Sequence, residues 1–457
     1  MVEIVKLPAA ALSKAIRNKA ISATEAVDAY LNRIKAVNPE LNAVVQLCEK
    51  SAHDQASKAD KALAHGDITG LLHGVPFTIK DSFDTAGLIS TGGTKGRSNH
   101  VPSRDATIVS RLRASGAILL GKTNTSELTL SYETKNLIYG QTNNPYDLSR
   151  SPGGSSGGAA AIVAVGGSAF DIGSDYGGSL RFPAHCCGIA TIKPTSGRVP
   201  RTGHILPFGG VLDSFQQMGP LARSVEDLSL ILPIIAGPDD IDPGILPMAL
   251  YDPNAVDLTG LKVAFHSDNG IISPSPETEK VVRETAECLE DGGLIVTEIR
   301  PNGIEQSYNL MIELLSADGG TSIRRLLQDA GTKEHTLPWL GRAEPLDAAH
   351  FDTLIMRWYR FRSIMLSFFK DYDIILSPVN AFPAMPPGSF GADLEAFSYT
   401  MTYNITGWPA AVLRGGTSPE GLPIGVQIVA HPGREDVALA VAAYIEKALG
   451  EFQPAPI

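Results

Sequence analysis

The strongest constraint on the fold is a glycine- and serine-rich tract that runs from Ser151 to Arg181. It reads SPGGSSGGAAAIVAVGGSAFDIGSDYGGSLR, with one serine-bearing glycine turn around Ser155 and another around Ser179. Glycine lets a ligand or a second backbone approach where a Cβ would clash, so clustered glycines indicate a tight site. A flexible linker is the alternative reading, but linkers do not usually enclose an apolar run such as residues 159–165.

Each glycine turn exposes a short hydroxyl among bare backbone amides, as acyl transfer requires of a nucleophile with an oxyanion hole. A serine hydroxyl is a weak nucleophile until a base removes its proton. GGSSG at 153–157 matches the G-x-S-x-G elbow of α/β-hydrolases, which would make Ser155 the nucleophile. However, residues 149–152 read as loop where the elbow requires a strand, and no HGGG-type oxyanion motif is present. The α/β-hydrolase mechanism is therefore the less favoured alternative.

Cysteine and lysine chemistry provide two further possibilities. His185 and Cys186 are adjacent in the sequence, but adjacent residues do not face each other on a helix or strand, so we predict that this pair is structural. Lys80 ends the apolar segment GVPFTIKD at 74–81, which reads as a buried strand. Burial at this position would lower the pKa of a lysine from about 10.4 toward neutrality and make it a base.

Residues 116–123, GAILLGKT, match the phosphate-binding P-loop pattern letter for letter. A phosphate cradle needs a loop at the four variable positions, and here they read as a strand. We therefore do not predict nucleotide binding.

Composition excludes several classes of protein. The chain has 457 residues, of which 43% are hydrophobic and 19% charged, so it can bury a large core. Its net charge of −11 comes without a long basic run, so we expect no nucleic acid partner. The four cysteines lack metal-ligand or disulfide spacing, and no signal peptide or long apolar span is visible. These features predict a cytoplasmic protein without a membrane anchor or metal.

Strand-like and helix-like segments alternate along the chain, which predicts an α/β fold. The N-terminal part, within 8–62, reads as a helical layer that includes a capping box at Ser22 and Glu25. The further predicted elements are helices at 106–115, 224–236, 276–290, 303–331, 347–370 and 436–448, and strands at 117–121, 261–266, 294–299, 374–376, 410–413 and 424–429. We expect the strand–helix–strand unit at 261–299 to join the main sheet.

Three blocks carry a resemblance to a known family: GVPFTIKD, GGSSGG, and SDYGGSLRFPAHCCGIATIKPT. Together they resemble the signature of the amidase signature family, and the similarity extends to GLPIGVQIVA near the C-terminus. In that family a lysine and two serines form a Ser-cisSer-Lys triad. The resemblance assigns these roles to Lys80 as base, Ser155 as relay after a cis peptide bond, and Ser179 as nucleophile.

The resemblance also implies supporting roles around the triad. It places the oxyanion hole at the backbone amides of Tyr176, Gly177, Gly178 and Ser179. Ser156 is expected to bond within its turn, and Asp175 and Arg181 to brace the loop. Neither a metal nor an organic cofactor is implied.

The implied fold is a single α/β/α domain with a mixed, twisted central sheet covered by helices. We expect a helical layer at 1–62, a catalytic core at 66–260, a covering segment at 261–370, and strands with a closing helix at 371–457. Trp339 and Met356 are expected at the mouth of the pocket, and the exposed faces of the N-terminal helices could support a homodimer.

The implied reaction is hydrolysis by water of a small or medium acyl-amide, anilide or carbamate through an acyl-serine. A glutaminase subunit of a tRNA-dependent amidotransferase is the alternative, because it shares the triad; a binding protein is a third. Tyr176, the His185-Cys186 pair and Arg414 depart from the usual pattern, so the substrate preference does not carry over.

Overall fold

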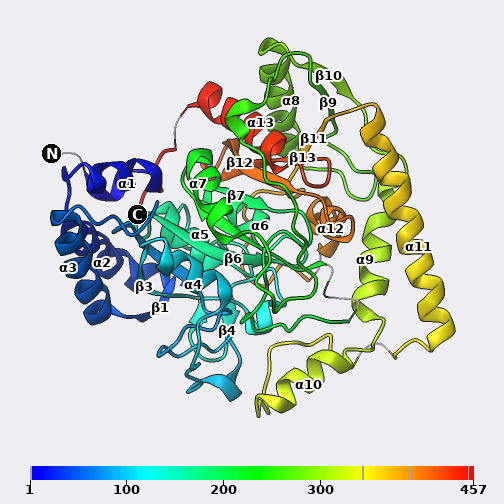
Figure 1. The fold of residues 1–457 in the computed structure, drawn as a ribbon. Coiled ribbons are helices and arrows are strands. Elements are labelled where there is room, and N and C mark those ends of the chain that lie inside the picture. The colour runs from blue at the N-terminus through cyan, green and yellow to red at the C-terminus, as the bar shows by residue number, and fades with distance from the viewer. Residues whose placement is uncertain (1–2, 211–212, 214, 342–343, 392, 451) are drawn as a thin grey trace.

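One large sheet runs through the whole molecule. The structure is a computed structural model that describes residues 3–210, 213, 215–341, 344–391, 393–450 and 452–457. The sheet has eleven strands in the order β1-β3-β2-β6-β8-β7-β12-β13-β11-β9-β10 (Figure 1). Its pairings are both parallel, as between β2 and β6, and antiparallel, as between β6 and β8. The mixed α/β sheet covered by helices is confirmed.

The strands are short and distributed over most of the chain. The main sheet contains β1 (Val44–Leu47), β2 (Pro76–Lys80), β3 (Ile118–Thr123), β6 (Phe170–Asp175), β7 (Ala190–Lys193), β8 (Gln217–Ala222), β9 (Lys262–Phe265), β10 (Ile295–Glu298), β11 (Ile374–Pro378), β12 (Ala410–Thr417) and β13 (Pro423–Ala430), while β4 (Lys135–Asn136) and β5 (Gly140–Gln141) form a separate pair. Every residue of β2, β3 and β6 is buried, because helices and loops cover both faces of the central strands.

The helices alternate with these strands. They are α1 (Ala9–Arg17), α2 (Ala23–Leu41), α3 (Glu49–Ala64), α4 (Thr107–Ala114), α5 (Gly157–Ala164), α6 (Arg181–Cys187), α7 (Val225–Ile235), α8 (Pro276–Asp291), α9 (Ser307–Ser316), α10 (Thr321–Asp329), α11 (Ala348–Ser367), α12 (Ser398–Ile405) and α13 (Glu435–Leu449). No helix of the described part of the chain is both long enough and apolar enough to span a membrane.

The N-terminal layer contains one element that the sequence did not indicate. The predicted capping box begins α2: Ser22 accepts a hydrogen bond from the Glu25 amide, and the Glu25 carboxylate accepts one from the Ser22 amide. Between α2 and α3 the chain forms β1, which pairs with β3 as an edge strand. Four residues are too few for a visible strand periodicity between two helices.

At the other end of the sheet, β9, α8 and β10 extend the sheet as expected, with β9 parallel to β11. Helix α11 lies at the far side of the molecule from α1–α3 (Figure 1). Its Trp358 and Phe361 are buried, but Met356 is 63% exposed and Tyr359 is 59% exposed. The apolar run on α11 is therefore only partly core.

The helix–sheet arrangement places the site at the ends of two parallel strands. In the register of β2 with β6, Thr78 pairs with Asp171 and Ile79 with Ile172. In this register Lys80 ends its strand level with Gly173, just before Ser174 and Asp175, the last residues of β6. Helix α5 packs close by because Gly158 has no side chain: a Cβ there would lie 2.5 Å from the backbone nitrogen of Asn124.

A buried ion pair joins α13 to the loop after β7. Glu435 accepts hydrogen bonds from the Arg198 guanidinium at 2.8 and 3.0 Å and from the Thr195 amide at 3.0 Å. We expect Glu435→Ala to lower the free energy of unfolding by about 3–5 kcal/mol, because the Arg198 charge is left buried without its partner. Urea unfolding measures the change.

The matched control is Glu298→Ala, which removes a partner of Arg283 at the surface. We expect this substitution to cost less than about 1 kcal/mol. Equal effects of the two substitutions would contradict a structural role for the buried pair.

Candidate active site

The Lys80 amine is the centre of the candidate site. Lys80 is fully buried at the end of β2. Its Nζ lies 2.6 Å from Ser155 Oγ, 2.9 Å from Ser156 Oγ and 3.0 Å from Ser174 Oγ. Burial lowers the pKa of Lys80 well below its usual value, although the carboxylates of Asp175 and Asp171 oppose this shift. The amine is therefore suited to accept a proton.

Ser155 is held in the turn that precedes α5. The peptide bond between Gly154 and Ser155 is cis, as the resemblance implies. Thr134 Oγ1 lies 2.9 Å from the Gly153 carbonyl and 3.3 Å from that of Ser155, and it accepts a hydrogen bond from the Gly157 amide. The residues before the turn are loop, so the strand that an α/β-hydrolase elbow needs is absent there.

Ser179 lies in the second glycine turn and is 5% exposed. Its carbonyl accepts a hydrogen bond of 3.3 Å from the Ser156 amide, so the two turns are in direct contact. Within the described part of the chain, the Ser179 hydroxyl makes no hydrogen bond, and none joins it to Ser155. Ser179 is thus beside the turn that holds Ser155, with its hydroxyl uncommitted.

The amides of the second turn divide into two groups. The Gly178 amide donates to Asp175 Oδ1 at 2.9 Å. The amides of Tyr176, Gly177 and Ser179 make no hydrogen bond to any residue that the structure describes. Of the four predicted oxyanion donors, only the Gly178 amide is therefore engaged within the described part of the chain.

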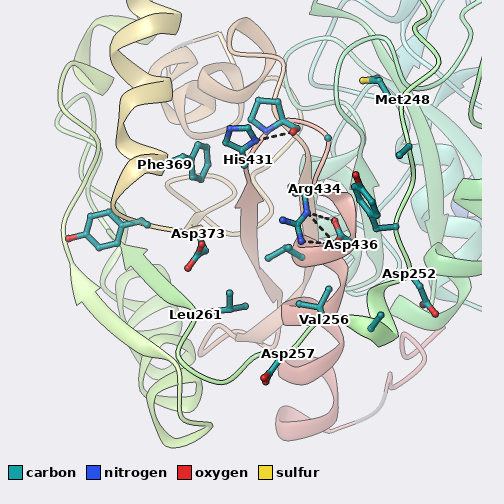
Figure 2. A pocket seen from close by; sticks show the side chains of 17 residues that line it. Met248, Asp252, Val256, Asp257, Leu261, Phe369, Asp373, His431, Arg434 and Asp436 are labelled. Carbon is teal, nitrogen blue, oxygen red and sulfur yellow. Dashed lines mark hydrogen bonds and ion pairs between the residues drawn. The ribbon is translucent and has the colours of Figure 1, made fainter.

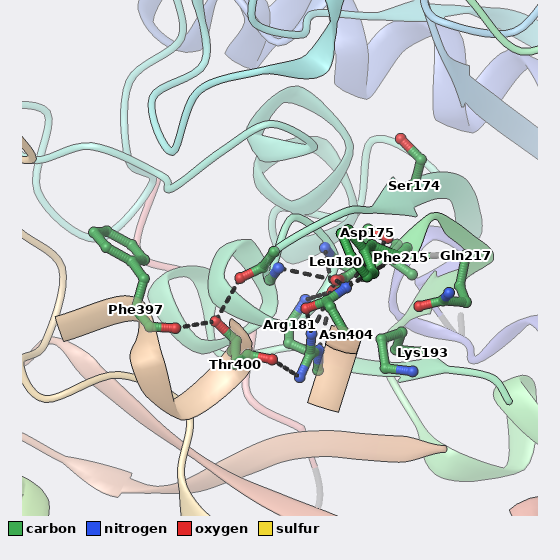
Figure 3. A network of polar contacts seen from close by, with 12 residues as sticks. Ser174, Asp175, Leu180, Arg181, Lys193, Phe215, Gln217, Phe397, Thr400 and Asn404 are labelled. Carbon is green, nitrogen blue, oxygen red and sulfur yellow. Dashed lines mark hydrogen bonds and ion pairs between the residues drawn. The ribbon is translucent and has the colours of Figure 1, made fainter. Parts of the chain in front are cut away.

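Asp175 and Arg181 pair with each other next to this turn (Figure 3). The Arg181 guanidinium bonds both Asp175 oxygens, at 2.9 and 3.0 Å, and also the Thr400 carbonyl, Asn404 Oδ1 and Gln427 Oε1. Burial alone would raise the pKa of Asp175, but Arg181 and the Asn404 amide keep it well below its usual value. The pair is buried and fully engaged, and its bracing role stays a prediction.

A second carboxyl group, that of Asp171, lies on β6. Its Oδ2 accepts hydrogen bonds from Thr78 Oγ1 at 2.6 Å and Thr123 Oγ1 at 3.1 Å. Burial raises the pKa of Asp171 to about 7. The charge next to Lys80 therefore changes near neutral pH.

Aromatic side chains surround the second turn. The Gly177 carbonyl accepts hydrogen bonds from Tyr132 at 2.9 Å and from Thr400 at 2.7 Å. Tyr132 stacks on Phe397, and Tyr176 contacts Phe215, which packs edge-on against Trp358. Aromatic rings therefore lie around the turn that carries Ser179.

Other residues singled out from the sequence lie elsewhere. His185 Nδ1 accepts from the Gly425 amide, and its Nε2 lies 3.0 Å from the Phe382 carbonyl, so both ring nitrogens contact backbone. Arg414 contacts Tyr146 and Thr417 near the end of β12. Trp339 and Met356 are exposed, and their place at a pocket mouth stays a prediction. Gly121 and Lys122 lie in β3, so the P-loop match is a strand.

Sequence reasoning missed several residues of the site. Ser174 lies within the tract, but no local signal in the sequence marks it, because its role depends on the register of β6. Thr400 and Asn404 come from α12, far along the chain, and His204 lies 3.2 Å from Ser174 Oγ. No local pattern marks these contacts, which arise from the sheet.

A cavity of about 1050 Å³ lies apart from these serines (Figure 2). Its lining includes Phe369, His431 and Arg434, and Arg434 is paired with Asp436. None of its lining residues belongs to the serine site. In the part of the chain that the structure describes, no group of three histidine, cysteine or acidic side chains is placed to hold a metal.

Comparisons with known proteins agree with one another. A family model described as Amidase matches residues 25–439. The chain is 36% identical to an indoleacetamide hydrolase of Bradyrhizobium diazoefficiens, over 95% of this chain and 85% of that protein. It is 33% identical to a glutamyl-tRNA(Gln) amidotransferase subunit of Alkaliphilus metalliredigens, over 97% of each. The structure of a 6-aminohexanoate cyclic dimer hydrolase, complexed with substrate, has a TM-score of 0.89 and 28% identity, covering 100% of this chain and 99% of that one.

Replacing Lys80 by Met tests the neutral state of the buried amine. In the unfolded chain a lysine keeps its proton up to about pH 10.4, whereas burial lowers the pKa of Lys80 in the folded protein. The unfolded state therefore binds more protons. As the pH rises, the free energy of unfolding of the wild type should increase relative to that of Lys80→Met. The gain is at most about 1.4 kcal/mol per pH unit, and urea unfolding between about pH 6 and about pH 9 measures it.

Lys122→Met is the matched control, since Lys122 is also fully buried and burial lowers its pKa to about 8. Its stability difference from wild type should stay constant below this pH and change only above it. If the Lys80→Met difference is also constant from about pH 6 to about pH 8, the amine is charged in the folded protein.

Proposed function

Because the chain belongs to the amidase signature family and is an amide hydrolase, we propose that Lys80, Ser155 and Ser179 perform its reaction. The observation that carries this assignment is the 2.6 Å contact between Lys80 Nζ and Ser155 Oγ, made by two fully buried side chains. The uncommitted hydroxyl of Ser179 in the adjoining turn supports it. The first functional step is acyl transfer to this hydroxyl.

In the proposed reaction, the Ser179 oxygen attacks the carbonyl carbon of the substrate. The Ser179 proton passes to Ser155, and the Ser155 proton passes to neutral Lys80. When the C–N bond breaks, the ammonium of Lys80 returns a proton through Ser155 to the leaving nitrogen. Water then attacks the acyl-serine and uses the same relay, so the lysine supplies both base and acid.

We propose that the amides of Tyr176, Gly177 and Ser179 hold the oxyanion. The Gly178 amide, which bonds Asp175, instead fixes the turn. An oxyanion donor that is already in place stabilises the transition state without reorganisation and contributes about 3–4 kcal/mol. Asp175, Arg181 and the Ser156 amide maintain the turn in this form.

The substrate class we propose is a small or medium acyl-amide or anilide, with carbamates as a further possibility within the same chemistry. The aromatic surroundings of Ser179, among them Tyr132 and Tyr176, favour an apolar acyl or amine group. The named activity of the indoleacetamide hydrolase, which is 36% identical, agrees with a primary amide attached to an aromatic body.

A glutaminase subunit of a tRNA-dependent amidotransferase is the second candidate. The similarity to the Alkaliphilus amidotransferase protein over 97% of both chains favours it. The two functions differ in substrate and partner: a glutaminase prefers glutamine and works with further subunits.

We expect the purified chain alone to cleave aryl and alkyl amides faster than glutamine, measured by ammonia or amine release.

We also propose that the chain acts as one catalytic unit in the cytoplasm. The sheet includes strands from Val44 to Ala430, so all four predicted segments contribute to it. The four cysteines are unpaired, which suits a reducing compartment. A homodimer stays a prediction.

Removing the nucleophile or the base tests the proposed roles. We expect Ser179→Ala and Lys80→Met to lower kcat/KM for a cleaved amide at least about 1000-fold, because neither variant forms the acyl-enzyme by the relay. Mass spectrometry of quenched wild-type reactions should find the acyl group on Ser179. Ser149→Ala, at an exposed loop position, is the control and should keep wild-type activity. Turnover near wild type in Ser179→Ala would disprove the nucleophile.

The pH profile gives a further test, because only neutral Lys80 accepts the proton. The value of kcat/KM should rise with pH through the pKa of Lys80, well below 10.5. Asp171→Asn removes a carboxyl group that is ionised above about pH 7 and then raises the pKa of Lys80, so an acid limb above this pH should move to lower pH. An acid limb above about pH 7 that stays in place or moves upward would contradict the electrostatic account.

A further inference from the structure

Ser174 and His204 form a hydrogen-bonded chain that ends on the Lys80 amine. His204 Nε2 lies 3.2 Å from Ser174 Oγ, which lies 3.0 Å from Lys80 Nζ. Ser174 is 3% exposed and His204 is 8% exposed, so solvent hardly reaches the chain. The triad assignment uses neither residue.

The hydrogen bonds of His204 determine which ring nitrogen carries the proton. The Leu206 amide, which can only donate, lies 3.3 Å from His204 Nδ1. The Gln216 side-chain amide lies 3.2 Å from the same atom and also donates to the Leu206 carbonyl. Nδ1 is therefore an acceptor, and the proton is on Nε2, where it is donated to Ser174 Oγ.

This tautomer prevents His204 from acting as the base. Its Nε2 already carries a proton, and its Nδ1 is occupied on the side away from the serines. Burial, together with the charge of Arg201, lowers the pKa of His204 well below its usual value. A neutral donor fixes the Ser174 oxygen without adding a charge to the site.

The backbone around His204 is tied to the loop that follows Lys80. Phe83 and His204 form a β-bridge, and their rings pack edge-on at 5.0 Å between centroids. The Ile205 amide donates to the Ser82 carbonyl at 2.8 Å, and the Asp84 amide donates to the Gly203 carbonyl at 2.8 Å. The His204 ring is thus fixed against the loop that directly follows Lys80.

A lysine side chain has four rotatable bonds, so a relay needs contacts that hold the amine in place. Ser156 Oγ donates its proton to the Ser174 carbonyl at 3.3 Å and can accept an N–H from Lys80. Ser174 Oγ accepts the second N–H. With both N–H groups engaged, the lone pair of the neutral amine faces Ser155, at the shortest contact of the three.

From this geometry we infer that Ser174 and His204 are positioning residues, which hold the Lys80 amine with its lone pair toward Ser155. The inference rests on the proposed function only in taking Lys80 as the base and Ser179 as the nucleophile. It does not depend on which amide is the substrate. Removal of either residue should slow the activation of Ser179 and leave substrate binding intact.

The test uses two readouts in the full-length protein. One is kcat and KM for a cleaved amide, and the other is the rate at which a fluorophosphonate probe labels Ser179. We expect Ser174→Ala and His204→Phe each to lower kcat and the labelling rate at least about 10-fold, with KM within about 3-fold. Ser174→Thr, which keeps the hydroxyl, and His204→Gln, which keeps an N–H donor, should recover most of the loss.

The double variant distinguishes a chain from two separate effects. If His204 acts through Ser174, the combined loss equals the larger single loss, whereas independent effects multiply. The acid limb of the pH profile should remain in His204→Phe, because His204 is not the base. Ser168→Ala and His73→Gln change other buried hydroxyl and imidazole groups, and they should keep the labelling rate.

Three outcomes would overturn the inference. They are wild-type labelling rates in both Ser174→Ala and His204→Phe, multiplied losses in the double variant, or loss of the acid limb in His204→Phe. A wild-type protein that labels at Ser179 but cleaves no amide refutes the proposed substrate class only, and the variants are then still compared by labelling. A wild-type protein that does not label refutes the nucleophile and this inference with it.

Discussion

The site depends on the burial of the Lys80 amine among uncharged serine hydroxyls. Transfer of an ammonium group into the interior is strongly unfavourable unless the group is both paired with an opposite charge and hydrogen-bonded. Around Lys80 the nearest polar atoms are three serine hydroxyls, and the carboxylates of Asp171 and Asp175 act without direct contact. The amine therefore stays neutral and basic. When it becomes protonated, the serine hydroxyls can accept hydrogen bonds from its N–H groups.

The parallel pairing of β2 and β6 creates this environment. It places the end of β2, at Lys80, next to the end of β6, where Ser174 Oγ lies 3.0 Å from the amine. The two glycine turns then approach each other, because the Ser156 amide bonds the Ser179 carbonyl. The Asp175–Arg181 pair, which α12 helps to enclose, keeps the second turn rigid, so distant segments stabilise a site that one tract supplies.

Much of this arrangement could be predicted from the sequence, since its signals are local. The glycine turns, the apolar strand ending in Lys80 and the capping box at Ser22 all lie within a few residues. What could not be predicted depends on tertiary packing. The short strand β1 has no periodicity of its own, and Ser174 becomes important only through the register of its strand. His204 acts through a loop that reaches back across the sheet, and the Gly178 amide is diverted to Asp175 by the shape of the turn.

The most direct measurement is the titration of the Lys80 amine itself. Lysine labelled with ¹³C and ¹⁵N in the side chain reports protonation by NMR, and comparison with the spectrum of Lys80→Met assigns the signal. Our account predicts that Lys80 titrates well below the usual lysine pKa of about 10.4, apart from the exposed lysines. Titration of Lys80 together with those lysines would show a charged amine and contradict the account.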